Sequence, residues 1–312
     1  MTTFAFVFPG QGSQTVGMLD AWGDHPAVRD TLAEASDALG TDIGQLIHEG
    51  PKEQLDLTTN TQPVMLAAAI ACYRAWMAET GLAPALVAGH SLGEYSALVA
   101  AGSLALADAL PLVRFRAQAM QDAVPVGVGA MAAILGLDAE VVRVTCAEVS
   151  AAVGEPVEAA NFNDPKQIVI AGTKGAVDQA CEALKGRGAK RALPLAVSAP
   201  FHSSLMKPAA ERLQQRLLSV TLRAPAIPLV NNIDVAVQTE PDAIREALYR
   251  QAFGPVRWVE VVQAIRARGA THLFECGPGK VLAGLARRID ASLVVGNVLD
   301  PATLAEAKGL LQ

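Results

Sequence analysis

Ala85-Leu-Val-Ala-Gly-His-Ser-Leu-Gly-Glu94 is the stretch of sequence that decides the fold. Its apolar first half runs into Gly89-His-Ser91-Leu-Gly93 and a helical pattern follows, so the serine falls in the strand-turn-helix setting of a GxSxG elbow. A side chain at either glycine would crowd the tight turn, and the helix N-terminus beneath Ser91 offers a free N–H and a favourable dipole to an oxyanion. Ser91 is therefore a candidate nucleophile. The alternative is a glycine-rich turn in which Ser91 only caps the helix.

The segments on either side of the elbow alternate between strand-like and helical patterns. Strand-like segments lie at residues 3–8, 86–89, 228–233, 271–275 and 292–298. Helical periodicity and capping signals mark residues 26–39, 62–79, 93–101, 107–123, 204–218, 241–251 and 259–268. Strands separated by helices indicate a mainly parallel sheet with helices on both faces. We expect an α/β fold with a large α/β-hydrolase-like body.

Residues 127–198 follow a different pattern, as a domain inserted into that body would. The expected order is a strand at 131–137, a helix at 139–151, strands at 156–162 and 167–171, a helix at 174–185 and a strand at 191–197. This βαββαβ order predicts a ferredoxin-like small subdomain. Turn-rich flanks mark its limits. The large subdomain then comprises residues 1–126 and 199–312, and we expect the ligand in the cleft between the two parts.

Composition and charge exclude several classes of protein. Hydrophobic residues make up 51% of the 312 residues and charged residues 18%, which is typical of a compact globular chain with a large core. The formal net charge is -6 and no Lys/Arg cluster is visible, which argues against nucleic acid or an anionic membrane surface as a partner.

The N-terminus and the cysteines predict a cytoplasmic protein. Residues 1–8 lack a positive n-region and resemble a strand more than a signal peptide, and the longest apolar run, residues 64–73, is too short to span a bilayer. The cysteines are far apart, with no spacing typical of a metal or redox pair: Cys72, Cys146, Cys181 and Cys276. A reducing compartment and no metal site are the natural expectations.

One histidine is the best candidate for a general base. Four others belong to polar helices or an apolar strand, or point away from the apex of the elbow: His25, His48, His90 and His272. His202 lies in Ser198-Ala-Pro-Phe-His-Ser203, where the chain re-enters the large body, and could take the Ser91 proton and return one to the leaving group. No Asp or Glu stands out as a third member, so we expect a backbone carbonyl or an amide to orient the histidine.

Three motifs occur together in this chain: Phe8-Pro-Gly-Gln-Gly-Ser-Gln14, Gly89-His-Ser-Leu-Gly-Glu94 and Phe201-His202. With them the chain resembles the malonyl-CoA:acyl carrier protein transacylases and the acyltransferase domains of polyketide and fatty acid synthases, over essentially its whole length. The resemblance implies ping-pong transfer: a malonyl group passes from malonyl-CoA to Ser91 as an ester, and then to the phosphopantetheine thiol of acyl carrier protein, for fatty acid or polyketide synthesis.

The resemblance also implies the remaining catalytic residues. Gln11 and the backbone N–H of Leu92 would flank the oxyanion, in keeping with a Gly-rich loop that can approach the acyl carbon. Gln251, in Leu248-Tyr-Arg-Gln251, matches the position whose segment orients the histidine.

Arg116 matches the family arginine that pairs with the free carboxylate of malonate. A guanidinium grips a carboxylate with two parallel hydrogen bonds. On the sequence alone Arg114 is an equal candidate, and the spacing to Met120 selects Arg116. The other residues implied in substrate binding are Met120, Asn163 and Phe201. A ring at Phe201 would crowd a branched acyl chain.

The implied partners are malonyl-CoA and acyl carrier protein, with no cofactor, no nucleic acid and no membrane, and a monomer is our expectation. Acyl carrier proteins are generally acidic, so we expect a docking patch among basic residues on or near the insert: Lys166, Lys185, Arg187, Lys190 and Arg191.

Three alternatives share parts of these motifs. A serine esterase or thioesterase would share the elbow, but the HGGG loop and an evident acid in Ser-Asp-His order are missing from the sequence. A stand-alone acyltransferase of a polyketide synthase would share the chemistry and serve another client. A non-catalytic scaffold that docks carrier protein would not need Gln11, Ser91, Arg116 and His202 together.

Overall fold

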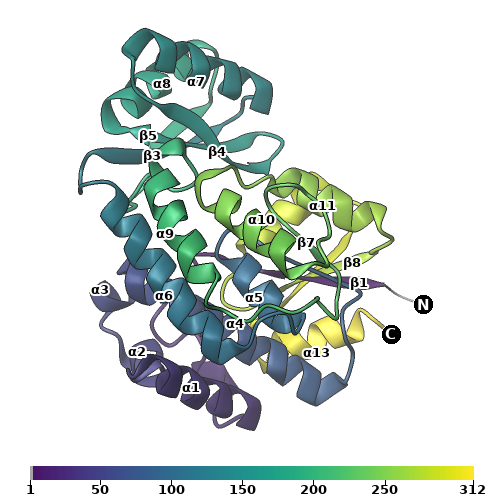
Figure 1. The fold of residues 1–312 in the computed structure, drawn as a ribbon. Helices are drawn as coiled ribbons and strands as arrows, with labels where there is room; N and C mark the ends of the chain where they lie inside the picture. Colours follow the sequence, from purple (N-terminus) through teal and green to yellow (C-terminus); the bar gives the residue numbers. More distant parts are fainter. Residues whose placement is uncertain (1–2) are drawn as a thin grey trace.

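The computed structural model describes residues 3–312 and contains two sheets (Figure 1). Five parallel strands in the order β7-β2-β1-β8-β9 form one sheet, and four antiparallel strands in the order β4-β5-β3-β6 form the other. The predicted α/β class with a mainly parallel sheet is confirmed. Residues 1 and 2, which open the expected large subdomain, lie outside the described residues.

The parallel sheet is built around β1 (Phe4–Phe8), whose five residues are all buried. A strand covered on both faces is expected to be apolar throughout, as Phe-Ala-Phe-Val-Phe is. β1 pairs with β2 (Leu86–Gly89) on one side and with β8 (His272–Cys276) on the other. β7 (Leu229–Val230) and β9 (Val294–Val298) are the edges. The five expected strands are present, and β7 is shorter than predicted.

Helices cover the parallel sheet, and the longest of them, α4, is buried over most of its length. The helices and short 3-10 turns outside the antiparallel sheet are η1 (Asp20–Trp22), α1 (Pro26–Leu39), α2 (Ile43–Glu49), α3 (Lys52–Leu55), α4 (Thr58–Thr80), α5 (Gly93–Ala100), α6 (Leu106–Ala123), η2 (Ser204–Met206), α9 (Lys207–Leu217), α10 (Pro241–Phe253), α11 (Trp258–Ala267), α12 (Val281–Ile289) and α13 (Pro301–Gly309). No helix of residues 3–312 has the length and apolarity needed to cross a membrane.

The antiparallel sheet is formed by one continuous part of the chain, which lies at the top of the molecule in Figure 1. Its elements follow in the order β3 (Gly129–Leu135), α7 (Ala139–Val153), β4 (Val157–Asp164), β5 (Gln167–Thr173), α8 (Lys174–Gly186) and β6 (Arg191–Pro194). This is the predicted succession of strands and helices. A separate apolar cluster joins the sheet to its two helices, including Ile134, Val142 and Leu184.

One edge of the antiparallel sheet is tied to the segment that follows α10. The N–H of Phe162 on β4 donates to the carbonyl oxygen of Val256 (2.9 Å), and the N–H of Val256 donates to the carbonyl oxygen of Ala160 (2.9 Å). An ion pair between Asp164 and Arg288 (2.7 Å) lies at the end of the same strand. These contacts tie β4 to the segment after α10 and to α12, which packs against β8 and β9 of the parallel sheet.

Candidate active site

The structure confirms the strand-turn-helix setting of Ser91. β2 ends at Gly89 and α5 begins at Gly93, and Ser91 between them has a φ of 53°, a left-handed conformation that side chains rarely adopt. The flanking glycines are required by close contacts. A Cβ on Gly93 would lie 2.1 Å from the carbonyl oxygen of Phe8, and one on Gly89 would lie 1.9 Å from the backbone of Gly93. The turn therefore presents the serine at its apex.

His202 lies against the serine, as predicted. Ser91 Oγ and His202 Nε2 are 2.6 Å apart. On the other side of the ring, Nδ1 faces the carbonyl oxygens of Gln251 (2.9 Å) and Gly254 (3.2 Å). Because a carbonyl only accepts, Nδ1 carries the proton and Nε2 is left with a lone pair that accepts from the serine hydroxyl. A backbone carbonyl thus holds the position that a carboxylate takes in a Ser-His-Asp triad.

The surroundings keep the imidazole of His202 neutral. Burial and the positive charge of Arg116 lower the pKa of His202 to about 3, although hydrogen bonds to the two carbonyl groups oppose the shift. A neutral ring at every ordinary pH is available as a proton acceptor.

Arg116, on α6, is 2% exposed and has no carboxylate partner among residues 3–312. Its Nη1 donates to Gln62 Oε1 (2.8 Å), and its Nη2 donates to Gln251 Oε1 (3.3 Å) and to Ser91 Oγ (3.4 Å). The guanidinium also lies 5.5 Å from the centre of the Tyr95 ring, and its Nε has no hydrogen-bond partner within the described chain. Burial lowers the pKa of Arg116. A buried cation that makes no direct ion pair within the described residues therefore stands beside the serine.

Ser91 opens into a cavity of about 490 Å³. Its walls come from the Gly-rich loop after β1, the elbow, α6, strands of the antiparallel sheet and the segment before His202, and they include Gln11, Leu92, Arg116, Met131 and Phe201. The backbone N–H groups of Gln11 and Leu92 make no hydrogen bond within residues 3–312, so both are free to serve an oxyanion. The side chain of Gln11 donates to Thr58 Oγ1 (3.3 Å).

Three of the predicted residues do not line this cavity. Met120 is buried in the main core, at 1% exposure, one turn along α6 from Arg116. Asn163 lies beside a neighbouring cavity of about 230 Å³, and its Oδ1 is 2.8 Å from His90 Nε2. Gln251 is fully buried behind the serine. The structure therefore brings Gln251 to the site as a support, and keeps Met120 away from it.

Several polar residues of the site were not singled out in the sequence. Gln62 and Asn232 are both buried. Gln62 accepts a hydrogen bond from Arg116, and Asn232 accepts one from the N–H of Ser91 (2.7 Å). Gln62 is a buried amide just before the apolar run of α4, and Asn232 lies two residues after the end of β7, a strand of the parallel sheet. Polar residues in both places are typical of functional sites, so these were usable signals.

Among residues 3–312, no group of His, Cys, Asp and Glu side chains is arranged to hold a metal ion. Three members of the expected basic patch are in local ion pairs: Lys166 with Asp138 (2.7 Å), Lys185 with Glu182 (2.8 Å) and Arg187 with Glu148.

Comparisons with known proteins agree with this geometry. A family model described as the acyl transferase domain matches residues 5–288. A malonyl CoA-acyl carrier protein transacylase of Escherichia coli strain K12 is 54% identical over 308 residues, which cover 98% of this chain and 99% of that protein. The chain belongs to the malonyl-CoA:acyl carrier protein transacylase family.

Solved structures place the transacylase in the same family. An acyl-carrier-protein S-malonyltransferase from Burkholderia pseudomallei 1710b is 67% identical, with a TM-score of 0.96 and coverage of 98% of this chain and 99% of that one. The structure of a malonyl-transacylase in complex with a type II PKS acyl-carrier protein is 50% identical to this chain. Its TM-score is 0.96, and the match covers 98% of this chain and 99% of that one.

Proposed function

We propose that this transacylase moves a malonyl group from malonyl-CoA to the phosphopantetheine thiol of acyl carrier protein through an ester on Ser91. The observation that carries the proposal is Arg116, a buried guanidinium that makes no ion pair within residues 3–312 and whose Nη2 lies 3.4 Å from Ser91 Oγ. An acyl group with a free carboxylate, as in malonate, supplies the missing anion. The names of relatives that match the whole chain support the same substrate and acceptor.

In the first half-reaction Ser91 Oγ attacks the thioester carbonyl while His202 Nε2 accepts the hydroxyl proton. The N–H groups of Gln11 and Leu92 stabilise the resulting oxyanion, and losing one such donor typically costs about 3 to 4 kcal/mol at the transition state. The tetrahedral intermediate collapses with loss of the coenzyme A thiolate, which takes the proton from His202. In the second half-reaction His202 accepts a proton from the carrier-protein thiol, whose sulfur attacks the ester. Ser91 then leaves and takes the proton back from His202.

Acyl selectivity rests on Arg116 and Phe201. The arginine would bind the malonyl carboxylate in two parallel hydrogen bonds, and the ring of Phe201, which lines the cavity, would crowd a branched acyl chain. Met120 would act from the core, by supporting α6 beneath the arginine. Asn163 would act through His90, next to the nucleophile.

We further propose that residues 1–126 and 199–312 form an α/β-hydrolase-like body, and that residues 127–198 form a ferredoxin-like small subdomain. The strand order β4-β5-β3-β6 and the separate apolar cluster support the second assignment. A monomer in the cytoplasm is the proposed state. Carrier proteins of fatty acid synthesis and of polyketide synthesis are both candidate acceptors, because one relative is described as bound to a type II PKS carrier protein.

The decisive experiment records the intact mass of the protein after incubation with malonyl-CoA alone. We expect a malonyl adduct on the parent protein and none on Ser91→Ala. Arg116→Ala should lose malonyl labelling and gain acetyl labelling from acetyl-CoA. Release of free malonate without an adduct would favour a hydrolase, and no adduct with no turnover would favour a scaffold.

A further inference from the structure

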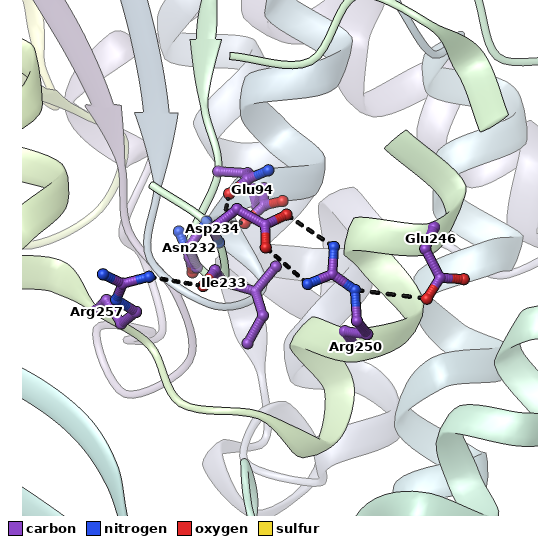
Figure 2. Close-up of polar contacts among 8 residues, drawn as sticks. Glu94, Asn232, Ile233, Asp234, Glu246, Arg250 and Arg257 are labelled. Carbon is purple, nitrogen blue, oxygen red and sulfur yellow. Dashed lines mark hydrogen bonds and ion pairs between the residues drawn. The ribbon is translucent and has the colours of Figure 1, made fainter. Parts of the chain in front are cut away.

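Glu94 is a buried carboxylate next to the nucleophile to which the mechanism above assigns no role. It lies in the first turn of α5, is 2% exposed, and makes no ion pair within the described chain. Its Oε2 accepts two hydrogen bonds, from the backbone N–H of Asn232 (2.9 Å) and from Nε2 of Gln251 (3.1 Å). Figure 2 shows Glu94 next to Asn232, at the loop that follows β7.

The bond to Gln251 determines which way the Gln251 amide faces. The two hydrogens of its Nε2 go to the carbonyl oxygen of Ser91 (3.0 Å) and to Glu94 Oε2, so Oε1 faces Arg116 and accepts from it (3.3 Å). A flipped amide would point its oxygen at two acceptors and its hydrogens at a guanidinium, which only donates. Arg116 would then lose one of its two amide acceptors.

The bond to Asn232 supports the turn itself. The side chain of Asn232 accepts from the N–H of Ser91 (2.7 Å) and donates to the carbonyl oxygen of Gly89 (2.7 Å), so it spans the strained turn. Glu94 accepts from the backbone N–H of Asn232 and so fixes the backbone from which this side-chain amide extends. One oxygen of Glu94 thus connects Asn232, which holds the Ser91 turn, to Gln251, which accepts from Arg116.

The surrounding elements are held by a separate ion pair. Arg250, the neighbour of Gln251 on α10, makes two hydrogen bonds to Asp234 in the loop after β7 (2.6 and 2.7 Å) and a contact to Glu246 (3.4 Å), as Figure 2 shows. This pair already places α10 against the loop, and the bonds of Glu94 act on the side-chain amide of Gln251 and on the backbone of Asn232.

We propose that Glu94 is a positioning residue for malonyl selection: through Gln251 it keeps an acceptor oxygen on Arg116, and through Asn232 it steadies the Ser91 turn. The inference rests on the proposed function, because it concerns how Arg116 is presented to a carboxylate. What Glu94 contributes is an acceptor oxygen and not its charge. Burial raises the pKa of Glu94 to about 7, although the hydrogen bonds from Gln251 and Asn232 and the positive charge of Arg116 oppose the shift.

The test compares Glu94→Gln, Glu94→Asp and Glu94→Leu with the parent protein, and uses Glu246→Gln as the matched control. Glu246 is a half-exposed residue that touches only Arg250 in this network. Single-turnover labelling of Ser91 is followed by intact mass with malonyl-CoA and, separately, with acetyl-CoA. A residue that acts only on folding lowers both rates equally, whereas one that acts through Arg116 lowers the malonyl rate more.

We expect Glu94→Gln to keep the parent ratio of malonyl to acetyl labelling, because the glutamine oxygen replaces the carboxylate oxygen. Glu246→Gln should keep it too, because Glu246 contacts neither Gln251 nor Asn232. Glu94→Leu should lower that ratio by about tenfold, and Glu94→Asp by a smaller factor, since the shorter side chain withdraws the acceptor. In combination with Gln251→Ala, Glu94→Asp should lower the ratio no further than Gln251→Ala alone.

Two outcomes would overturn the inference. An unchanged ratio in both Glu94→Leu and Glu94→Asp would show that Glu94 does not act through Arg116. Glu94→Gln as impaired as Glu94→Leu would show that the charge, not the acceptor oxygen, is what counts. If Glu94→Leu does not fold, Glu94→Asp and its combination with Gln251→Ala decide. Failure of the proposed function is seen separately, as a parent protein that malonyl-CoA does not label.

Discussion

At the scale of single residues, His202 is a general base whose Nδ1 donates to backbone carbonyl oxygens and not to a carboxylate. The carbonyl oxygens of Gln251 and Gly254 fix its tautomer, while burial and the charge of Arg116 keep the ring neutral. A carboxylate in the same place would favour the imidazolium and compete with the substrate carboxylate for Arg116. The carbonyl acceptor therefore suits a site that must bind an anion with the arginine.

The pH dependence of acylation follows from this environment. The pKa of His202 lies at about 3, below its ordinary value, so the ring stays neutral and remains a base as the pH falls. We expect kcat/KM for labelling of Ser91 by malonyl-CoA to show no loss from His202 protonation between about pH 7.5 and about pH 5. Rapid-quench intact mass across this range measures it. A fall centred near the ordinary histidine pKa would contradict the effect of this environment on His202.

Arg116 should bind the malonyl carboxylate through two parallel hydrogen bonds and not only through its positive charge. Arg116→Lys keeps the cation but loses the planar pair of donors, so we expect malonyl labelling of Ser91 to slow by about tenfold or more. Arg114→Lys is the matched control, because Arg114 lies on the same helix and donates to the carbonyl oxygen of Leu39, away from the cavity. Equal effects of the two substitutions would argue against a specific clamp.

The sequence predicted the pairing of Ser91 with His202, and it was the resemblance to the family that selected Arg116 over Arg114. The elbow is a local pattern, but the direction in which an arginine points from a helix depends on its neighbours in space. Gln62 and Asn232 reach the site across long stretches of chain, and no local spacing connects them to Ser91.

At the scale of elements, the elbow depends on how closely α5 approaches β1. Gly93 opens the helix directly against the carbonyl of Phe8, with no room for a Cβ. The absence of side chains at residues 89 and 93 thus permits both the turn and the packing of the helix against the sheet.

Gly93→Ala should therefore destabilise the protein strongly. A Cβ 2.1 Å from the oxygen of Phe8 forces the backbone of α5 or β1 to move, and we expect a loss of about 3 kcal/mol or more in the free energy of unfolding. Urea denaturation measures it. The control is Gly309→Ala at the end of α13, where a Cβ meets nothing within 4 Å and where we expect no loss. Comparable stability of the two variants would contradict the close approach.

The boundaries of helices were predicted best where the helical pattern extends over many residues. The predicted helices at residues 26–39 and 107–123 agree with α1 and α6 to within a residue. The strand expected at residues 228–233 is only Leu229–Val230, because Asn231 and Asn232 leave the sheet to make turn and elbow contacts. The short helices α12 and α13 were not predicted.

At the scale of the whole molecule, the general base depends on a contact between β4 of the antiparallel sheet and the segment that follows α10. Gly254, which accepts from His202, lies two residues before Val256, and Val256 pairs with β4 of the antiparallel sheet. The order of strands and helices in the insert followed from its sequence pattern. Its attachment to Val256 did not, because the paired residues lie far apart in the chain and leave no local signal.

The ion pair between Asp164 and Arg288 is where this attachment can be tested. The Asp164 side chain is 7% exposed and the Arg288 side chain 54%, so Arg288→Ala leaves a buried carboxylate without its cation while removing a mostly solvated group. Solvent around the arginine screens the pair, and we expect a loss of about 1 to 2 kcal/mol in the free energy of unfolding. The adjacent β4 edge should loosen, with faster hydrogen exchange at the N–H groups of Phe162 and Val256.

Arg287→Ala is the matched control for that experiment. Arg287 neighbours Arg288 on α12 but donates to the carbonyl oxygen of Val295 in the parallel sheet. Its removal should leave exchange at Phe162 and Val256 unchanged, because no contact to β4 is lost. If the attachment positions the base, Arg288→Ala should also slow labelling of Ser91 by malonyl-CoA and by acetyl-CoA to the same extent, since Gly254 orients His202 for either donor. Faster exchange with unchanged labelling would mean that the carbonyl of Gln251 alone is enough to hold the imidazole.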